Sequence, residues 1–194
     1  MWNDLYRRND YFYGVQPDDF IKQYLNYIKG PVLILAESDG RNTVYLATRG
    51  FEVLAVNAHS AGLHKAHRLA RERNVSIETR QIDPEFFVPE PGKFRTVLSA
   101  FAHLPKRIRK NLHGRVMRAL EPGAIVMLVG YGKNEAGHGT CGPDAEDMLY
   151  DRTDIEEEFS GCETILSCEH EAGVIAGAAH TEEAGIVQYI GRKT

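Results

Sequence analysis

Residues 32–42, with the sequence VLILAESDGRN, decide the fold that we expect for this chain. They begin with the continuous apolar run Val32–Ala36, which is typical of a strand buried on both faces and therefore of a parallel sheet. A polar turn with Gly40 follows, and a short helix is predicted from about Asn42 to Thr48. A strand, a tight turn and a helix N-terminus form a place where backbone N–H groups face a polar ligand. The alternative is a plain strand-to-helix turn that binds nothing.

Helices and strands alternate on both sides of this segment. Further helices are predicted over Pro17–Ile28, Ser60–Arg73 with Ser60 as N-cap, Pro105–Leu120 and Asp151–Phe159. Further strands are predicted over Glu52–Val56, Val75–Gln81, Thr96–Ala100 and Ala124–Val129, and an edge hairpin near Thr164–Glu171 and Gly185–Gly191. We therefore expect one α/β domain over residues 1–194, with a doubly wound, mostly parallel seven-stranded sheet and an antiparallel edge hairpin.

Ligands of such sheets bind outside the carboxyl ends of the strands. The candidate loops are therefore those that follow the strands, and the segment 130–150 stands out because it is long and rich in glycine. We interpret it as a lid loop, and residues 1–30 as a covering segment and helix.

Composition and charge exclude several functional classes. The net charge of −4 argues against a broad nucleic-acid-binding surface, and no apolar stretch reaches the length of a membrane span. The N-terminus lacks the pattern of a signal peptide, and three cysteines without CxxC spacing indicate neither a disulfide framework nor a zinc site. We expect a cytoplasmic protein whose partner is a small molecule, and make no prediction of its oligomeric state.

Residues 32–42 resemble the first motif of class I S-adenosylmethionine (SAM)-dependent methyltransferases. The likeness is to the branch of tellurite-resistance and thiopurine-type small-molecule methyltransferases. Four other segments resemble motifs of that branch in the same order, namely YFYGVQPDDF (11–20), FAHLP (101–105), LEPGA (120–124) and GTCGP (139–143). The resemblance implies a Rossmann-like fold, SAM as cofactor, and in-line methyl transfer to a thiol, a metalloid oxyanion or a similar small molecule.

The resemblance also implies a role for particular residues. The residues that it places around SAM are Ala36, Glu37, Ser38 and Gly40 at the methionine part, Asn57 at the ribose, Ala58, Asp83 and Pro84 at the adenine, and Ala100 and Phe101 at the flank. Tyr13 is expected to cover the sulfonium, because a cation is attracted to an aromatic face, although it could equally pin the terminal segment. His103 is expected on the methyl-transfer side, with helix capping as the alternative, and Arg41 and His103 are candidates to hold an anionic acceptor.

The first motif departs from the family pattern. Ala36 and Ser38 replace glycines, and Asn57 replaces an acid that binds the ribose. Since hydrogen bonds to charged groups are the stronger ones, losing this charge weakens binding by about tenfold. A non-catalytic methyltransferase-like protein with weak or lost SAM binding therefore remains an alternative. An NAD-dependent enzyme is disfavoured because the turn and the ribose position lack that family's signature.

Two other pairs of residues are candidates for a site. His64 and His67 share a helix face at a spacing that suits a metal, but no third ligand is evident, and we predict no metal site. His138 and Cys141, in the Gly-rich loop, are either lid contacts or ordinary loop residues.

Overall fold

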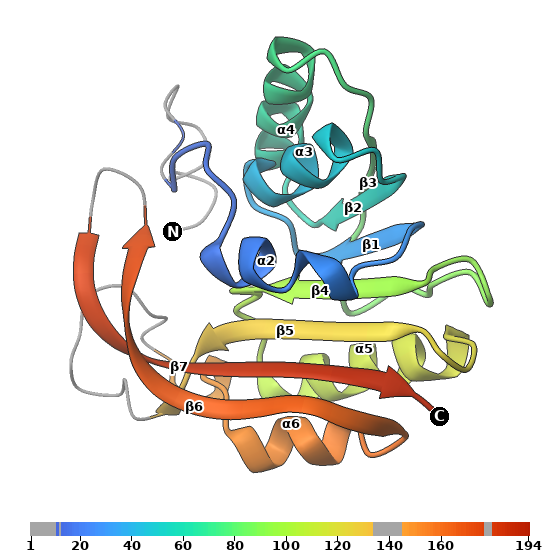
Figure 1. Cartoon of the computed structure of the whole chain (residues 1–194), viewed down its shortest axis with the longest axis vertical. Coiled ribbons are helices and arrows are strands. Elements are labelled where there is room, and N and C mark those ends of the chain that lie inside the picture. The colour runs from blue at the N-terminus through green and yellow to red at the C-terminus, as the bar shows by residue number, and fades with distance from the viewer. Residues whose placement is uncertain (1–10, 12, 134–144, 177–179) are drawn as a thin grey trace.

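The computed structural model describes residues 11, 13–133, 145–176 and 180–194. Its seven strands form one sheet in the order β3-β2-β1-β4-β5-β7-β6. The strands are β1 (Val32–Leu35), β2 (Val53–Asn57), β3 (Glu78–Gln81), β4 (Thr96–Ala100), β5 (Ile125–Tyr131), β6 (Cys162–Ala176) and β7 (His180–Lys193). β1 to β5 are parallel to one another, whereas β7 is antiparallel to both β5 and β6. The predicted doubly wound sheet with an edge hairpin is confirmed (Figure 1).

Helices cover both faces of this sheet. They are α2 (Asp19–Gln23), the 3-10 helix η1 (Leu25–Tyr27), α3 (Arg41–Thr48), α4 (Ser60–Glu72), α5 (Lys106–Ala119), the 3-10 helix η3 (Glu146–Met148) and α6 (Arg152–Glu158). Alternate residues of β1 enter opposite cores, because successive strand side chains point to opposite faces. Leu33 and Leu35 pack with α5 and α6, whereas Val32 and Ile34 pack with α2 and α3.

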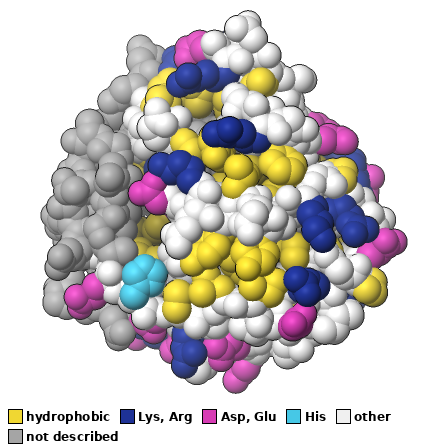
Figure 2. All heavy atoms as spheres, viewed as in Figure 1, with side chains coloured by type: hydrophobic (Ala, Val, Ile, Leu, Met, Phe, Trp, Pro, Cys, Tyr) yellow, Lys and Arg dark blue, Asp and Glu magenta, His cyan; other side chains and the backbone are white. Residues whose placement is uncertain are grey.

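The face in front of β5, β7 and β6 carries no helix in Figure 1. Figure 2 shows hydrophobic side chains gathered over α2 and over the strands below it. Partly buried residues of this core include Tyr24, Leu25, Ile165 and Leu166. The strands β1, β2 and β4, at whose ends the pocket lies, are almost entirely buried.

Several predicted boundaries were wrong. The helix expected over Pro17–Ile28 ends at Gln23 and continues only as η1. The chain turns toward the sheet there, since the N–H of Lys29 donates to Thr96 Oγ1 at 2.9 Å. α4 begins at Ser60 itself, so that His59, and not Ser60, is its N-cap.

The strands also differ in length from the prediction. β3 begins only at Glu78, because Val75 is still bonded through its N–H to the Ala70 carbonyl at the end of α4. The hairpin is much longer than expected, and its tip extends beyond β5, which pairs only with residues 186–192 of β7. β5 continues to Tyr131, two residues into the predicted loop. Residues His138, Cys141 and the segment 139–143 lie outside the described residues, so the lid stays a prediction.

Candidate active site

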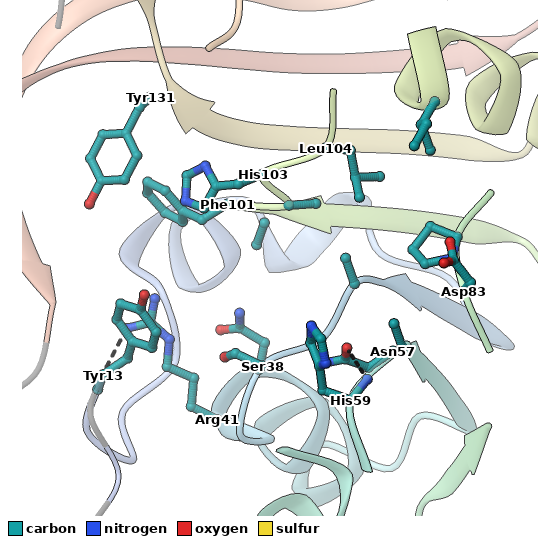
Figure 3. Close-up of a pocket in the computed structure, with 17 residues that line it drawn as sticks. Tyr13, Ser38, Arg41, Asn57, His59, Asp83, Phe101, His103, Leu104 and Tyr131 are labelled. Atoms are coloured by element: carbon teal, nitrogen blue, oxygen red, sulfur yellow. Dashed lines mark hydrogen bonds between the residues drawn. The ribbon is translucent and has the colours of Figure 1, made fainter. Parts of the chain in front are cut away.

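A pocket of about 310 Å³ lies where β1, β2 and β4 end. The strand order reverses between β1 and β4, which is where ligands bind in open α/β sheets. The volume lies at the lower end of the range that is usual for small-molecule sites. Its lining consists of Tyr13, Ala36, Ser38, Arg41, Asn42, Asn57, Ala58, His59, Asp83, Pro84, Ala100, Phe101, Ala102, His103, Leu104, Ile108 and Tyr131 (Figure 3). The structure thus brings together every predicted site residue except Glu37 and Gly40.

Glu37 faces away from the pocket and holds the loop to α3. Its Oε1 accepts the Ser38 N–H at 2.9 Å, and its Oε2 accepts the Thr43 N–H at 3.1 Å as well as the Thr43 hydroxyl. The side chain is buried. A carboxylate in this place satisfies N–H groups at a helix N-terminus that have no partner within the helix. Glu37 therefore shapes the loop and does not line the pocket.

Gly40 serves the packing of two helices. Its φ is 97°, and a Cβ at this position would lie 2.4 Å from Ala66 Cα on α4. Gly62 is a second close approach, because its Cβ would lie 2.0 Å from the carbonyl oxygen of Ser38. Both glycines let α4 press against the loop that carries Ser38, so their contribution to the site is indirect.

Two pocket residues have a left-handed backbone. Ala36 and Phe101 follow adjacent strands, β1 and β4, and each has a φ of 52°. Left-handed geometry costs a non-glycine residue roughly 1–2 kcal/mol. Strain of this kind gathers at functional sites, where the surrounding structure enforces it. Ala36 stands at a position where the resemblance expects a glycine.

Asn57 joins the loops after β1 and β2. Its Nδ2 donates to the Glu37 carbonyl, and its Oδ1 accepts the His59 N–H at 2.9 Å. These partners fix the orientation of the amide, because one is only an acceptor and the other only a donor. Asn57 lines the pocket, yet both ends of its amide are already engaged, so its expected contact with ribose stays a prediction.

One end of the pocket has the features expected around adenine. Asp83 is exposed, and its Oδ1 accepts the Glu85 N–H at 2.8 Å. Pro84 is buried beside it, and Leu104 and Ile108 add apolar surface. A carboxylate next to apolar walls suits a flat ring that carries an amino group.

The other end is aromatic. The rings of His103 and Tyr131 are stacked at 5.5 Å with an interplanar angle of 11°, and Phe101 meets Tyr131 edge-on at 5.0 Å. Figure 3 shows these side chains across the pocket from Tyr13 and Arg41. Burial lowers the pKa of His103 to about 4, so the imidazole is neutral at physiological pH.

The charge of Arg41 is already compensated. One guanidinium nitrogen donates to the Tyr13 carbonyl at 3.2 Å, and another lies 3.8 Å from Asp18 Oδ2. The guanidinium also lies 5.5 Å from the centroid of the Tyr13 ring. Arg41 therefore fastens the N-terminal segment to the loop after β1. Because its guanidinium is already paired, its charge is less available to bind an anion.

Tyr131 is the most informative residue that sequence reasoning missed. It lies at the carboxyl end of β5, and the prediction ended this strand at Val129. Also missed were Asn42, Ala102, Leu104 and Ile108. The signal for Tyr131 was its aromatic character directly after a buried strand, which we assigned to the loop.

Tyr150 supports the pocket from behind. Its hydroxyl donates to the Ala102 carbonyl at 2.6 Å, and its N–H donates to the Tyr131 carbonyl at 2.8 Å. A Cβ on Gly130 would lie 2.3 Å from the Tyr150 ring, so glycine is needed there. Tyr150 thus holds two walls of the aromatic end in place.

Within the part of the chain that the structure describes, the histidines of α4 do not gather with a set of possible metal ligands. His64 is exposed, and His67 Nε2 lies 2.8 Å from Thr79 Oγ1. Across the described ranges, no three His, Cys, Asp or Glu side chains gather as metal ligands would. Nor is any helix within those ranges long and apolar enough to cross a membrane.

Comparison with known proteins agrees with this geometry. Residues 32–123 match the family model described as a methyltransferase domain. The fold is the Rossmann-like fold that a solved SAM-dependent methyltransferase also has. A search among curated proteins gives no significant match.

Solved structures share this fold at low sequence identity. One, described for the conversion of a disulfide bond into a thioacetal group during echinomycin biosynthesis, has a TM-score of 0.79 at 15% identity, covering 99% of this chain and 90% of that chain. A SAM-dependent methyltransferase from Methanosarcina mazei has a TM-score of 0.72 at 15% identity, covering 92% and 98%. TehB from Haemophilus influenzae has a TM-score of 0.71 at 15% identity, covering 90% and 66%.

Proposed function

We propose that this protein transfers the methyl group of SAM to a small-molecule acceptor by in-line displacement. The observation that carries the proposal is the pocket at the strand-order reversal, whose two ends differ in chemistry. Asp83 and Pro84 suit an adenine at one end, and Phe101, His103 and Tyr131 form an aromatic wall at the other. When bound, SAM supplies a methyl group on a positively charged sulfur.

The protein's own contribution is to bind, orient and exclude water. Ser38 and Ala36 line the pocket between its ends, next to the N-terminus of α3. The aromatic rings of the far end provide apolar surface and faces that attract a cation. Positioning alone supplies much of the acceleration of a displacement reaction.

The acceptor end favours a soft nucleophile that needs no strong base. Neutral His103 is a weak base because burial keeps its pKa at about 4. Arg41 is the only cation among the described lining residues, and its charge is paired with Asp18. These two facts support a thiol over a metalloid oxyanion, since an anion entering this end would find no uncompensated positive charge there.

Calorimetry with SAM and S-adenosylhomocysteine (SAH), followed by transfer of a labelled methyl group to small thiols, selenite and tellurite, tests the proposal. We expect SAM binding and labelled product with at least one thiol. His103→Ala is expected to lower transfer, whereas His64→Ala, an exposed histidine outside the pocket, leaves it unchanged. Failure to bind SAM at millimolar concentration would overturn the proposal.

A non-catalytic relative is the second candidate. It is favoured by the engagement of both ends of the Asn57 amide and by the strained Ala36 where the resemblance expects glycine. Weak SAM binding without transfer to any acceptor in the panel would support this candidate.

A further inference from the structure

His59 occupies the middle of the pocket. It directly follows the end of β2, lines the pocket and is half-buried. In Figure 3 its imidazole stands beside Asn57, between Ser38 on one side and Asp83 on the other. If Asp83 marks the adenine end and Ser38 the methionine part, the group between them is the ribose.

The neighbouring Asn57 is poorly placed to serve that ribose alone. One N–H of its Nδ2 is committed to the Glu37 carbonyl, and its oxygen already accepts the His59 N–H. An amide has two N–H donors and an oxygen with two lone pairs, so Asn57 keeps at most one donor and one acceptor site for a ligand. A vicinal diol presents two hydroxyls, each able to donate and accept. Recognition of the diol therefore calls for a second polar group at this place.

The chemistry of an imidazole matches that requirement. A neutral imidazole has one N–H donor and one acceptor nitrogen, and it can bond to a hydroxyl in either sense. The side chain makes no capping bond to α4, so the start of this helix does not depend on it. His59 was not among the residues that the sequence resemblance placed around SAM.

We propose that His59 binds the ribose hydroxyls of the cofactor, a task that the resemblance gives to a carboxylate at position 57. The inference rests on the proposed function, because it takes SAM as the occupant of the pocket. It adds a binding residue and assigns to Asn57 the separate task of joining two loops.

Calorimetry with SAH and with its 2′-deoxy and 3′-deoxy forms tests this inference without any turnover. We expect the parent protein to bind at least one deoxy form several-fold more weakly, since a hydrogen bond between neutral groups corresponds to about 2- to 12-fold in affinity. His59→Ala is expected to bind SAH weaker by a similar factor and to lose the discrimination between SAH and that deoxy form. His59→Gln, which keeps a donor and an acceptor, should recover part of both.

Two controls separate the outcomes. His64→Ala, on the exposed face of the same helix, should bind SAH like the parent, and thermal unfolding checks that each variant is folded. If the parent and His59→Ala discriminate equally against the deoxy forms, the assignment of His59 is overturned. The proposed function stays intact in that case, because the parent still binds SAH. No SAH binding by the parent would overturn both. If His59→Ala does not fold, His59→Gln takes its place in the comparison. Its altered side-chain geometry should reduce the discrimination between SAH and the deoxy form, and discrimination equal to that of the parent would overturn the assignment of His59.

Discussion

Asn57 donates a hydrogen bond to the backbone carbonyl of Glu37, and this bond joins the loops that follow β1 and β2. The same amide accepts the N–H of His59 at the start of α4. Because the two loops form adjacent walls of the pocket, one buried amide sets their separation. The position where the resemblance expects a ribose-binding acid thus has a structural task that an acid could not perform.

Asn57→Asp is therefore expected to destabilise the protein. The carboxylate has no N–H for the Glu37 carbonyl and would bring a charge against its oxygen in a buried place. An unsatisfied buried group costs about 1–3 kcal/mol, and we expect a loss of that size in urea unfolding at pH 7.5.

Asn74→Asp is the matched control for this change. Asn74 is exposed at the end of α4 with a φ of 54°, a conformation that asparagine and aspartate both tolerate. Its substitution should alter stability by less than about 0.5 kcal/mol. Equal stabilities of Asn57→Asp and the parent would show that the amide bond to Glu37 contributes nothing.

Ala36→Gly is expected to stabilise the protein. The residue has a φ of 52°, where glycine has no Cβ penalty, and relief of this strain offsets the greater freedom of glycine in the unfolded chain. We expect a gain of up to about 1 kcal/mol in the free energy of unfolding. Ala47→Gly, within α3, should instead lose about 0.5–1 kcal/mol. A loss at both positions would contradict the strain at Ala36.

Much of the fold could be predicted from the sequence, because several strands are continuous runs of apolar residues that become buried. Val32–Leu35 and Ile125–Val129 are fully buried in the structure, and their composition alone predicts a parallel sheet. The hairpin was underestimated because residues 172–185 are mainly small or charged, without the alternation that marks a strand. Local pattern could not reveal that β7 pairs along its whole length with β6.

The site was predictable in position but not in side-chain direction. The resemblance placed Glu37 at the ligand, whereas its carboxylate turns to Thr43, six residues further along the chain. Asn57 is engaged by a carbonyl 20 residues away. Such contacts depend on how α3 and α4 pack, which periodicity does not specify. Tyr131 was missed because a strand boundary was placed two residues early.

Gly62→Ala is expected to disturb the site through the backbone. The new Cβ would lie 2.0 Å from the Ser38 carbonyl oxygen, so either the loop or the first turn of α4 must move. Overpacking of this kind costs about 1–3 kcal/mol. SAH binding should weaken as well, because the displaced loop lines the pocket. Calorimetry and urea unfolding measure the two effects.

Gly114→Ala is the control for added volume in a helix. A Cβ there would meet only the end of the Arg118 side chain, at 3.5 Å, so alanine should raise stability by about 0.5–1 kcal/mol. Unchanged SAH affinity and stability in Gly62→Ala would contradict the close approach of α4 to Ser38.

Asp39→Asn is expected to change how stability depends on pH. Asp39 is fully buried; its Oδ1 accepts the Ser38 hydroxyl at 3.2 Å, and its Oδ2 has no partner. Burial, together with the nearby charge of Glu37, raises the pKa of Asp39 to about 6. The folded protein therefore holds this proton more tightly than the unfolded chain. Stability falls as the pH rises from about 4 to about 6, and it stays lower above that range.

The asparagine variant has no such proton to lose. Its free energy of unfolding relative to the parent should rise by roughly 2–3 kcal/mol between pH 4 and pH 7.5, because one pKa unit corresponds to about 1.4 kcal/mol. Asp19→Asn, at an exposed carboxylate on α2, is the control for removing a carboxylate that is not buried. Urea unfolding of the three proteins at both pH values measures the difference. If the Asp39→Asn variant and the parent differ by the same amount at both pH values, Asp39 does not carry a raised pKa, and the loop after β1 tolerates its charge through a contact with a neighbouring group.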